Sequence, residues 1–277
     1  MRTSLQDWSQ FLALTTTGIG AVLVAGCAVA YCLQDKFLYR SGHFGAVRDP
    51  RRNPEGSRLP SDRAIPFLPV KIPSEDAVLL TGWLMLQPQS TTVPTIIFFQ
   101  GSGGNIGQRM NTFELLYKQL GVNVLAVSYR GYGESEGEAT EEGLQMDIRA
   151  IVKWAFERSE IDTGKIVVQG RSLGGAAAIY AVWSCELPVF PNQIKGLIVE
   201  NTFLSVYDVV GDIWPPIAIL RSVFLRNYWP SFKRISTISC PILFVSGEAD
   251  ELIPAYHMHK LHENAASSPY RPFVMQK

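Results

Sequence analysis

The sequence predicts an α/β fold, in which a mostly parallel sheet is covered by helices on both faces. Short apolar runs such as 95–100 and 166–169 alternate with segments whose apolar residues recur at helical spacing. Parallel strands buried on both faces read as continuous apolar runs of this kind. In addition, the motif Gly170-Arg171-Ser172-Leu173-Gly174, a G-x-S-x-G pattern, follows the second run directly. With 277 residues, the chain can form one such domain with a large core.

The expected elements follow in a regular order after residue 65. An antiparallel pair over 67–72 and 77–86 opens the domain, and the later strands are expected at 95–100, 122–127, 166–169, 196–199, 241–246 and 270–275. Helices are expected over 110–120, from about Thr140 to Ala155 with Glu141 and Glu142 in the first turn, after Ser172, and over 256–264. Residues 202–235 break this rhythm and are expected to form a small helical cap over the site.

The N-terminal 35 residues are expected to form a transmembrane anchor, followed by a linker over 36–64 and the globular domain over 65–277. No charged residue occurs from Trp8 to Gln34, and the stretch 11–33 is long enough to span a bilayer. Basic residues are frequent after this stretch, whereas only Arg2 precedes it, which favours a cytoplasmic domain. A cleaved signal peptide, with 28–30 as its cleavage site, and a lipoprotein box at 23–27 are the alternatives.

Composition argues against several other classes of protein. The 25 basic residues balance the 25 acidic residues, so there is no basic field for nucleic acid. The four cysteines do not form a pattern that requires disulfides. We therefore expect a membrane-associated globular domain that does not bind nucleic acid.

Ser172 is the candidate nucleophile. In a G-x-S-x-G motif between a strand and a helix, the serine occupies a strained turn that exposes its hydroxyl at the edge of the sheet. A residue near positive φ crowds its neighbours two positions away, so glycine is favoured at 170 and 174. The alternative interpretation is an ordinary tight turn without catalytic meaning.

Ser102 and Leu173 are the candidate donors of an oxyanion hole. The glycine-rich segment 100–105 follows an expected strand, where this type of site supplies one backbone N–H, and the residue after the nucleophile supplies the other. The alternative is a glycine loop that only turns the chain. A phosphate-binding loop is disfavoured because no G-K-[ST] follows.

Asp250 is the candidate catalytic acid. It follows the expected strand 241–246 and lies after Ser172 in the chain, in the order serine, acid, histidine. Two alternatives remain open: Asp250 as a carboxylate that stabilises the following helical turn, and Glu200 as the acid instead.

The general base is the residue that the sequence does not identify. The imidazole is expected in a loop after the last strand, but the sequence stops at Lys277. The histidines are His43, in the linker, and His257, His259 and His262, on or near the helix after Asp250. We expect those three to be exposed helix residues without a metal site, although one of them acting as the base stays open.

The chain resembles the membrane-anchored α/β-hydrolases, which overlap with the serine-aminopeptidase-like hydrolase domain and are similar to protein depalmitoylases. The motifs that support this resemblance are 101–107 (GSGGNIG), 129–137 (YRGYGESEG), 170–175 (GRSLGG), 200–205 (ENTFLS) and 246–254 (SGEADELIP). The resemblance implies Ser172 as nucleophile and Asp250 as acid. It also implies a histidine and a covering helix shortly after Lys277, so the domain is expected to be incomplete at its C-terminus.

Two further positions depart from the pattern of these hydrolases. Gln100 stands where they usually have histidine, and Ser128 where they usually have aspartate. Neither change removes a backbone N–H, so both are expected to tune the site.

The predicted function is a serine hydrolase that cleaves an ester, thioester or amide through an acyl-enzyme on Ser172. The cap aromatics and the anchor favour a small acyl or lipid-like substrate or an acylated protein, at a membrane lipid bilayer, and no cofactor is implied. The alternative is a truncated or pseudo-hydrolase that binds a lipid or a protein partner without catalysis.

Overall fold

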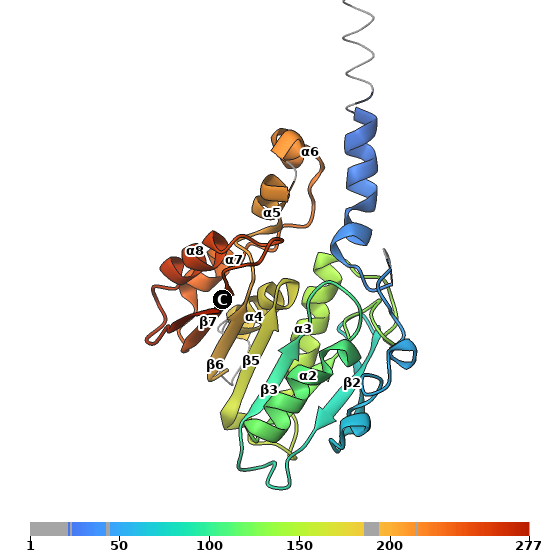
Figure 1. Cartoon of the computed structure of the whole chain (residues 1–277), viewed down its shortest axis with the longest axis vertical. Helices are drawn as coiled ribbons and strands as arrows, with labels where there is room; N and C mark the ends of the chain where they lie inside the picture. Colours follow the sequence, from blue (N-terminus) through green and yellow to red (C-terminus); the bar gives the residue numbers. More distant parts are fainter. Residues whose placement is uncertain (1–21, 23, 43–44, 186–193, 214, 277) are drawn as a thin grey trace, which may run out of the picture.

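The fold is a single eight-stranded sheet with helices on both faces, as predicted. The computed structural model describes residues 22, 24–42, 45–185, 194–213 and 215–276 (Figure 1). The strand order is β1-β2-β4-β3-β5-β6-β7-β8. β1 and β2 are antiparallel to their neighbours, and all later pairs are parallel.

The strands confirm the expected segments to within a few residues. They are β1 (Leu68–Pro73), β2 (Leu79–Met85), β3 (Thr95–Phe99), β4 (Asn123–Val127), β5 (Ile166–Arg171), β6 (Gly196–Glu200), β7 (Ile242–Gly247) and β8 (Phe273–Gln276). All side chains of β3 and β4 are buried, because both strands lie in the centre of the sheet and are covered on both faces. β8 begins three residues later than expected, and its last three residues are exposed.

The helices divide between the two faces of the sheet. On one face, α2 (Met110–Glu114) packs Met110 and Phe113 against Ile96 and Phe98 of β3. On the other face, α3 (Glu141–Phe156) and α4 (Leu173–Cys185) pack against each other and against the sheet. α4 is apolar almost all round because it lies between the sheet and the cap.

Local sequence explains where these helices begin. Thr140 has extended backbone, and its side chain accepts the N–H of Gly143, so α3 begins where the capping pattern predicts. The helix expected over 110–120 is less regular, because α2 continues as a π-helical turn over Leu115–Gln119 (η4).

The segment 202–235 forms short helices, as expected for a cap. They are α5 (Val206–Ile213), η6 (Pro215–Leu220), α6 (Arg221–Phe224) and α7 (Ser231–Arg234). α8 (Tyr256–Asn264) follows β7 and packs near α7. α5, α6 and the N-terminal helix project from the same end of the molecule (Figure 1).

The N-terminal helix runs over residues 24–38 and is fastened to the cap. The Gln34 side chain donates to the carbonyl of Phe224 at 3.0 Å and accepts the N–H of Arg226 at 2.9 Å. The expected transmembrane stretch 11–33 lies mostly outside the described residues. Within the described part of the chain, no helix has both the length and the apolar character needed to cross a membrane.

The segment expected as a linker also contacts the domain closely. It contains the 3₁₀-helices η1 (Pro50–Arg52) and η2 (Pro60–Arg63). Asn53 is buried, and its side-chain amide donates to the side-chain oxygen of Asn105 at 2.8 Å. Consequently, residues near the N-terminus help to hold the glycine loop that begins after β3.

Candidate active site

Ser172 lies in the turn between β5 and α4, with a φ of 55°. This left-handed conformation is unusual for a residue with a side chain and is stable only when the surroundings enforce it. The glycines around it show what enforces the turn. A Cβ at Gly170 would lie 1.9 Å from the carbonyl oxygen of Gly174, and a Cβ at Gly174 would lie 2.0 Å from that of Phe99. Side chains at either position would collide with backbone atoms.

Hydrogen bonds hold the backbone of Ser172 from both sides. Its N–H donates to the carbonyl of Glu200 at 3.0 Å, and its own carbonyl accepts the Thr202 hydroxyl at 2.8 Å. Thr202 also packs against Gly175, where a Cβ would lie 2.5 Å from the threonine Cβ. The end of β6 and the residues after it thus fix the serine turn. Glu200 and Thr202 of the 200–205 motif therefore have a structural role.

The glycine loop after β3 approaches Ser172 closely. A Cβ at Gly101 would lie 3.6 Å from the Cβ of Ser172. The hydroxyl of Tyr132 donates to the carbonyl of Ser102 at 2.9 Å, and the hydroxyl of Tyr129 donates to the carbonyl of Gln100 at 3.1 Å. The 129–137 motif therefore anchors this loop, a role that its sequence alone did not indicate.

The two candidate oxyanion donors belong to the two segments next to the serine, the glycine loop and the first turn of α4. Leu173 is the first residue of α4, so its N–H is among those at a helix N-terminus that no intrahelical carbonyl accepts. Ser102 follows Gly101 in the loop and is half-buried. The positive end of the α4 dipole therefore lies next to Ser172.

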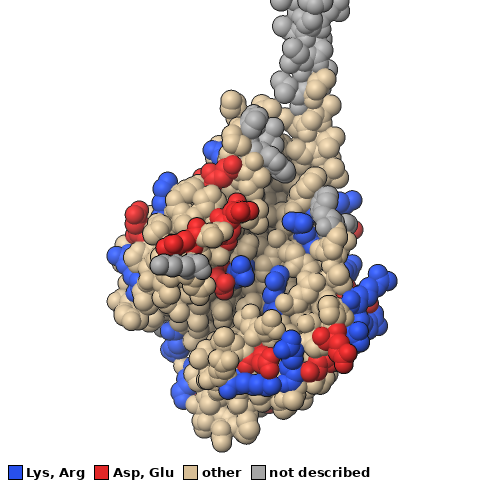
Figure 2. All heavy atoms as spheres, in the orientation of Figure 1, with Lys and Arg blue, Asp and Glu red and all other residues tan. Residues whose placement is uncertain are grey.

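Ser172 opens into a cavity of about 330 Å³. The cavity is lined by residues of β3, of the glycine loop, of α2 and its preceding turn, and of the ends of β5 and β6, among them Phe98, Ser102, Arg109, Arg171 and Glu200. Figure 2 shows the same face as Figure 1, hollowed in its middle, with charged side chains in the hollow. No histidine lines this cavity among the described residues.

Charged side chains are close together in this cavity. Arg171 forms an ion pair with Glu200 at 3.4 Å. The Nη2 of Arg109 donates to the carbonyl of Gly103 at 2.9 Å. Burial, together with the nearby positive charge of Arg171, lowers the pKa of Arg109. The site therefore has a partly desolvated cation beside the serine.

Asp250 follows β7, and its side chain forms no hydrogen bond with Ser172 in the described structure. Its Oδ1 accepts the N–H of Leu252 at 3.0 Å and that of Ile253 at 2.9 Å. This geometry corresponds to the carboxylate that stabilises the following turn, one of the two interpretations considered above. The bonds occupy one carboxylate oxygen, so a role for Asp250 as catalytic acid stays a prediction.

The expectation that the helix histidines are exposed is wrong for His257, which is 0% exposed. Its Nδ1 accepts the N–H of Leu204 at 3.2 Å, and its Nε2 lies 2.7 Å from the carboxylate of Asp212 in the cap. Because α8 packs beneath the cap, the polar ring is buried but fully bonded. Both ring nitrogens are occupied, so His257 is not placed to accept a proton from Ser172.

The other described histidines, His259 and His262, do not line the cavity of Ser172 either. The Nε2 of His262 lies 2.9 Å from the carbonyl oxygen of Arg271, and the ring of His259 stacks on Phe273 at 4.8 Å. His43 lies outside the described residues. Among the residues that are described, no group of three or more histidine, cysteine, aspartate or glutamate side chains is arranged to hold a metal ion.

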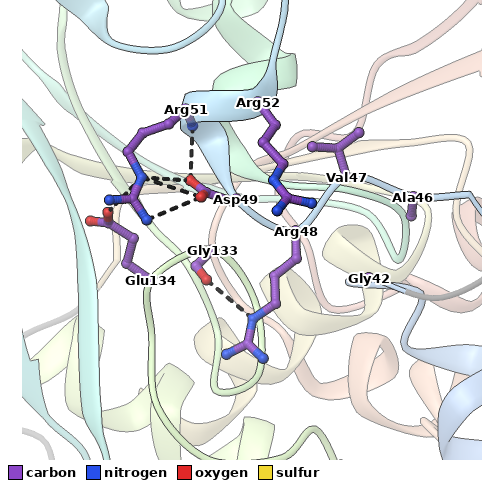
Figure 3. Close-up of a pocket in the computed structure, with 9 residues that line it drawn as sticks. All are labelled: Gly42, Ala46, Val47, Arg48, Asp49, Arg51, Arg52, Gly133 and Glu134. Atoms are coloured by element: carbon purple, nitrogen blue, oxygen red, sulfur yellow. Dashed lines mark hydrogen bonds and ion pairs between the residues drawn. The ribbon is translucent and has the colours of Figure 1, made fainter.

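A larger cavity of about 540 Å³ lies between the N-terminal segment and the loop after β4. Figure 3 shows that arginines dominate its wall. The Nε of Arg48 donates to the carbonyl of Gly133 at 3.2 Å, and Arg51 forms an ion pair with Asp49 at 2.9 Å. Among the residues that the structure describes, none of those lining this cavity has a nucleophilic side chain. For this reason we place the candidate active site at the smaller cavity.

Known proteins resemble the chain over most of its length. The family model for the alpha/beta hydrolase fold matches residues 94–228. The alpha/beta hydrolase domain-containing protein WAV2 of Arabidopsis thaliana is 33% identical over 270 residues, which are 93% of this chain and 84% of that protein. Protein bem46 of Schizosaccharomyces pombe is 35% identical over 215 residues, covering 76% and 70% of the two chains. An uncharacterized membrane protein of Saccharomyces cerevisiae is 33% identical, with coverage of 92% and 86%.

Solved structures agree on the fold. An alpha-beta hydrolase from Vibrio vulnificus superposes with a TM-score of 0.68 at 22% identity, covering 88% of this chain and 86% of that one. An esterase from Pyrococcus furiosus superposes with a TM-score of 0.64 at 22% identity, covering 85% and 89%. Together with the relatives above, these likenesses agree with the alpha/beta hydrolase fold. The chain therefore belongs to the alpha/beta hydrolase family.

Proposed function

We propose that this protein is a serine hydrolase that cleaves an ester, thioester or amide bond through an acyl-enzyme on Ser172. The observation that supports this most directly is the conformation of Ser172, which stands at a φ of 55° beside the glycine loop and at the first turn of α4. The hydroxyl would attack the substrate carbonyl, and the N–H groups of Ser102 and Leu173 would stabilise the resulting oxyanion. Water would then release the acyl group.

The experiment that tests this proposal is labelling with a fluorophosphonate, which reacts with activated serines. We expect the wild-type chain to be labelled and the variant Ser172→Ala to remain unlabelled. Ser205→Ala is a suitable control, because Ser205 is a buried serine after β6 whose hydroxyl bonds to Asp208. Equal labelling of wild type and Ser172→Ala would contradict the proposal.

A second candidate function is a non-catalytic alpha/beta hydrolase that binds a lipid or a protein partner. The observation that favours it is the lack of a histidine around the cavity among the described residues, because without a base a serine hydroxyl is a weak nucleophile. Loss of the base is expected to lower turnover roughly 10⁴- to 10⁶-fold. The two functions can be separated by comparing fluorophosphonate labelling of the 277-residue chain with that of a longer chain that includes the residues encoded after Lys277. Labelling restricted to the longer chain would assign the base to the added residues.

We also propose that the protein acts at a lipid bilayer on acyl or lipid-like substrates or on acylated proteins. In the N-terminal helix, Val22 and Val24 are 72% and 71% exposed, and in the cap Ile219 and Val223 are 85% and 70% exposed. Both groups lie at the end of the molecule from which the N-terminal helix projects (Figure 1). Exposed apolar surface of this kind is typical of membrane contact.

Flotation with phosphatidylcholine vesicles tests this placement. Wild type and variants are tested in a form lacking residues 1–21. We expect the double variant Ile219→Asp, Val223→Asp to float less with vesicles than wild type, because charge on the cap opposes insertion into the bilayer. Leu120→Asp is the control, since Leu120 is 60% exposed but follows η4 at the start of β4. Equal flotation of all three proteins would contradict a membrane contact of the cap.

A further inference from the structure

We propose that the cavity at Ser172 selects an acyl ester that has an anionic group, a phosphate or a carboxylate, and that Arg109 binds this group. This inference rests on the proposed serine hydrolase function and names the class of substrate. It follows from which charges line the cavity, how they are paired, and where Arg109 lies relative to the serine.

The cavity has more positive than negative side chains. Arg109 and Arg171 are the cations of the lining, and Glu200 is its carboxylate. Glu200 lies 3.4 Å from Arg171 and also attracts Arg109, so its single negative charge is shared between the two arginines. No ion pair of Arg109 with a carboxylate is found in the described structure. A net positive charge therefore remains on the wall to which Arg109 belongs.

Arg109 is held in a position that suits a ligand. It lies at the end of the 3₁₀-helix η3 (Ile106–Arg109), directly before α2, and is half-buried. Its Nη2 donates to the carbonyl of Gly103 at 2.9 Å. Partial burial removes water from the guanidinium, and the attraction of Glu200 offsets only part of this cost, because the pKa of Arg109 is still lowered. A bound anion would offset more of it. A guanidinium has five N–H donors, so the bond to Gly103 leaves donors for a phosphate or carboxylate.

The position of Arg109 also places the anionic group near the reacting bond. Gly103 follows Ser102, the candidate oxyanion donor, so Arg109 is bonded to the same loop that would hold the substrate carbonyl. An anion bound there would belong to the same small substrate molecule rather than to a distant part of a large one. In a partly desolvated cavity this attraction is stronger than in water.

Matched ester pairs test the proposal. One pair is monooctanoylglycerol and its phosphate, and the other is 4-nitrophenyl butyrate and the 4-nitrophenyl hemiester of glutaric acid. For wild type we expect kcat/KM to be at least tenfold higher for the anionic member of one or both pairs. A preference in the first pair assigns phosphate and in the second pair carboxylate. A preference for the neutral member of both pairs, or none in either, overturns the proposal.

The variant Arg109→Gln separates binding of the anion from a merely structural role. Glutamine keeps an N–H donor for the carbonyl of Gly103 but removes the charge. We expect the ratio of kcat/KM between anionic and neutral esters to fall at least tenfold, mainly through KM. If Arg109 only supports the loop, both esters lose activity equally and the ratio stays constant, which contradicts the proposal. The control is Arg58→Gln, because Arg58 is exposed and donates to the carbonyl of Asn53, outside the cavity.

A second readout does not require turnover. Inorganic phosphate should slow fluorophosphonate labelling of Ser172 in wild type. In Arg109→Gln, the same degree of protection should require at least tenfold more phosphate. Equal protection in the two proteins would contradict a phosphate site at Arg109. If neither ester pair is hydrolysed above the level of Ser172→Ala and no serine is labelled, it is the proposed hydrolase function that fails, so the two failures are distinguishable.

Discussion

Gly174 shows how a single residue without a side chain makes room for the serine turn. Its Cα packs against the backbone of β3, and an added Cβ would lie 2.0 Å from the carbonyl oxygen of Phe99. Because both partners are backbone atoms, neither a rotamer change nor a small shift relieves the contact. The glycine of the G-x-S-x-G motif is thus required by packing between β3 and α4 as well as by the turn itself.

The substitution Gly174→Ala is therefore expected to destabilise the protein by about 3 kcal/mol or more, at or above the upper end of the usual cost of overpacking. Urea unfolding followed by tryptophan fluorescence measures this. Gly103→Ala is the matched control, since a Cβ at Gly103 would meet nothing within 4 Å. Similar unfolding midpoints for the two variants would argue against a close contact at Gly174.

Tyr132 is a second single residue that holds the glycine loop in place. Its buried hydroxyl donates to the carbonyl of Ser102, which fixes the peptide next to the candidate oxyanion N–H. We expect Tyr132→Phe to lower kcat several-fold with little change in KM, because misplacement of an oxyanion donor affects the transition state more than the bound substrate. Steady-state kinetics on a neutral ester provides the measurement.

Tyr117→Phe is the control for that prediction. The hydroxyl of Tyr117 also donates to a backbone carbonyl, that of Leu86, at 3.0 Å, but it does not line the cavity of Ser172. A loss of kcat of equal size in both variants would show that the effect is general destabilisation rather than positioning.

At the scale of elements, Glu141 connects α3 to the cap. It is the first residue of α3, and its carboxylate accepts the N–H groups of Trp229 and Tyr228. The indole of Trp229 is buried and donates to the hydroxyl of Tyr39, next to the N-terminal helix. One helix N-terminus, the cap and the N-terminal segment are thereby joined at one point.

Removing this carboxylate with Glu141→Ala is expected to loosen the cap without unfolding the sheet. The N–H groups of Tyr228 and of the buried Trp229 would lose their acceptor, which costs about 1–3 kcal/mol for a buried group that is left unsatisfied. Hydrogen exchange of the peptide 225–232 should accelerate roughly tenfold or more. Glu142→Ala is the matched control, because Glu142 is the exposed neighbour on the same helix. Unchanged exchange in Glu141→Ala would contradict this role of Glu141.

At the scale of the whole molecule, a charged cluster ties the antiparallel strands to the parallel part of the sheet. Arg130, after β4, forms ion pairs with Asp76 at 2.7 Å and with the fully buried Asp147 of α3 at 2.8 Å. Ser74 donates to Asp147 at 2.8 Å. The cluster joins the β1–β2 turn, the 129–137 loop and α3.

Because of this cluster, the free energy of unfolding is expected to decrease at low pH. The hydrogen bond from Arg130 lowers the pKa of the Asp76 carboxyl below its ordinary value of 3.8. Ionised Asp76 therefore stabilises the folded protein above the ordinary pKa of about 3.8 that the carboxyl has in the unfolded chain. This stabilisation is lost as the pH falls through the lowered pKa of the folded protein. We expect wild type to lose more unfolding free energy than Asp76→Asn between about pH 5 and pH 3, as measured by urea unfolding at each pH. Parallel loss in the two proteins would contradict the assignment.

Much of the fold was predictable because its central strands are buried on both faces. Runs such as 95–100 and 122–127 are apolar throughout for that reason, and β3 and β4 occupy them almost residue for residue. The burial of His257 was not predictable, because it depends on the path of the cap and on Asp212, which is 45 residues away in the chain. The position of Arg109 in the cavity was not predictable from the sequence either, because it depends on how α2 packs over the sheet.

The sequence by itself determined the family, the serine turn and the order of strands along the chain. These follow from local steric and hydrophobic rules, which act on neighbouring residues. Only the tertiary structure decided which strands are neighbours, so that β3 and β5 bring Gly101 and Ser172 together. It also decided that Arg109 and Arg171 share one cavity with Glu200. Contacts of this kind depend on packing between distant segments, and the pattern of residues in any one segment does not encode them.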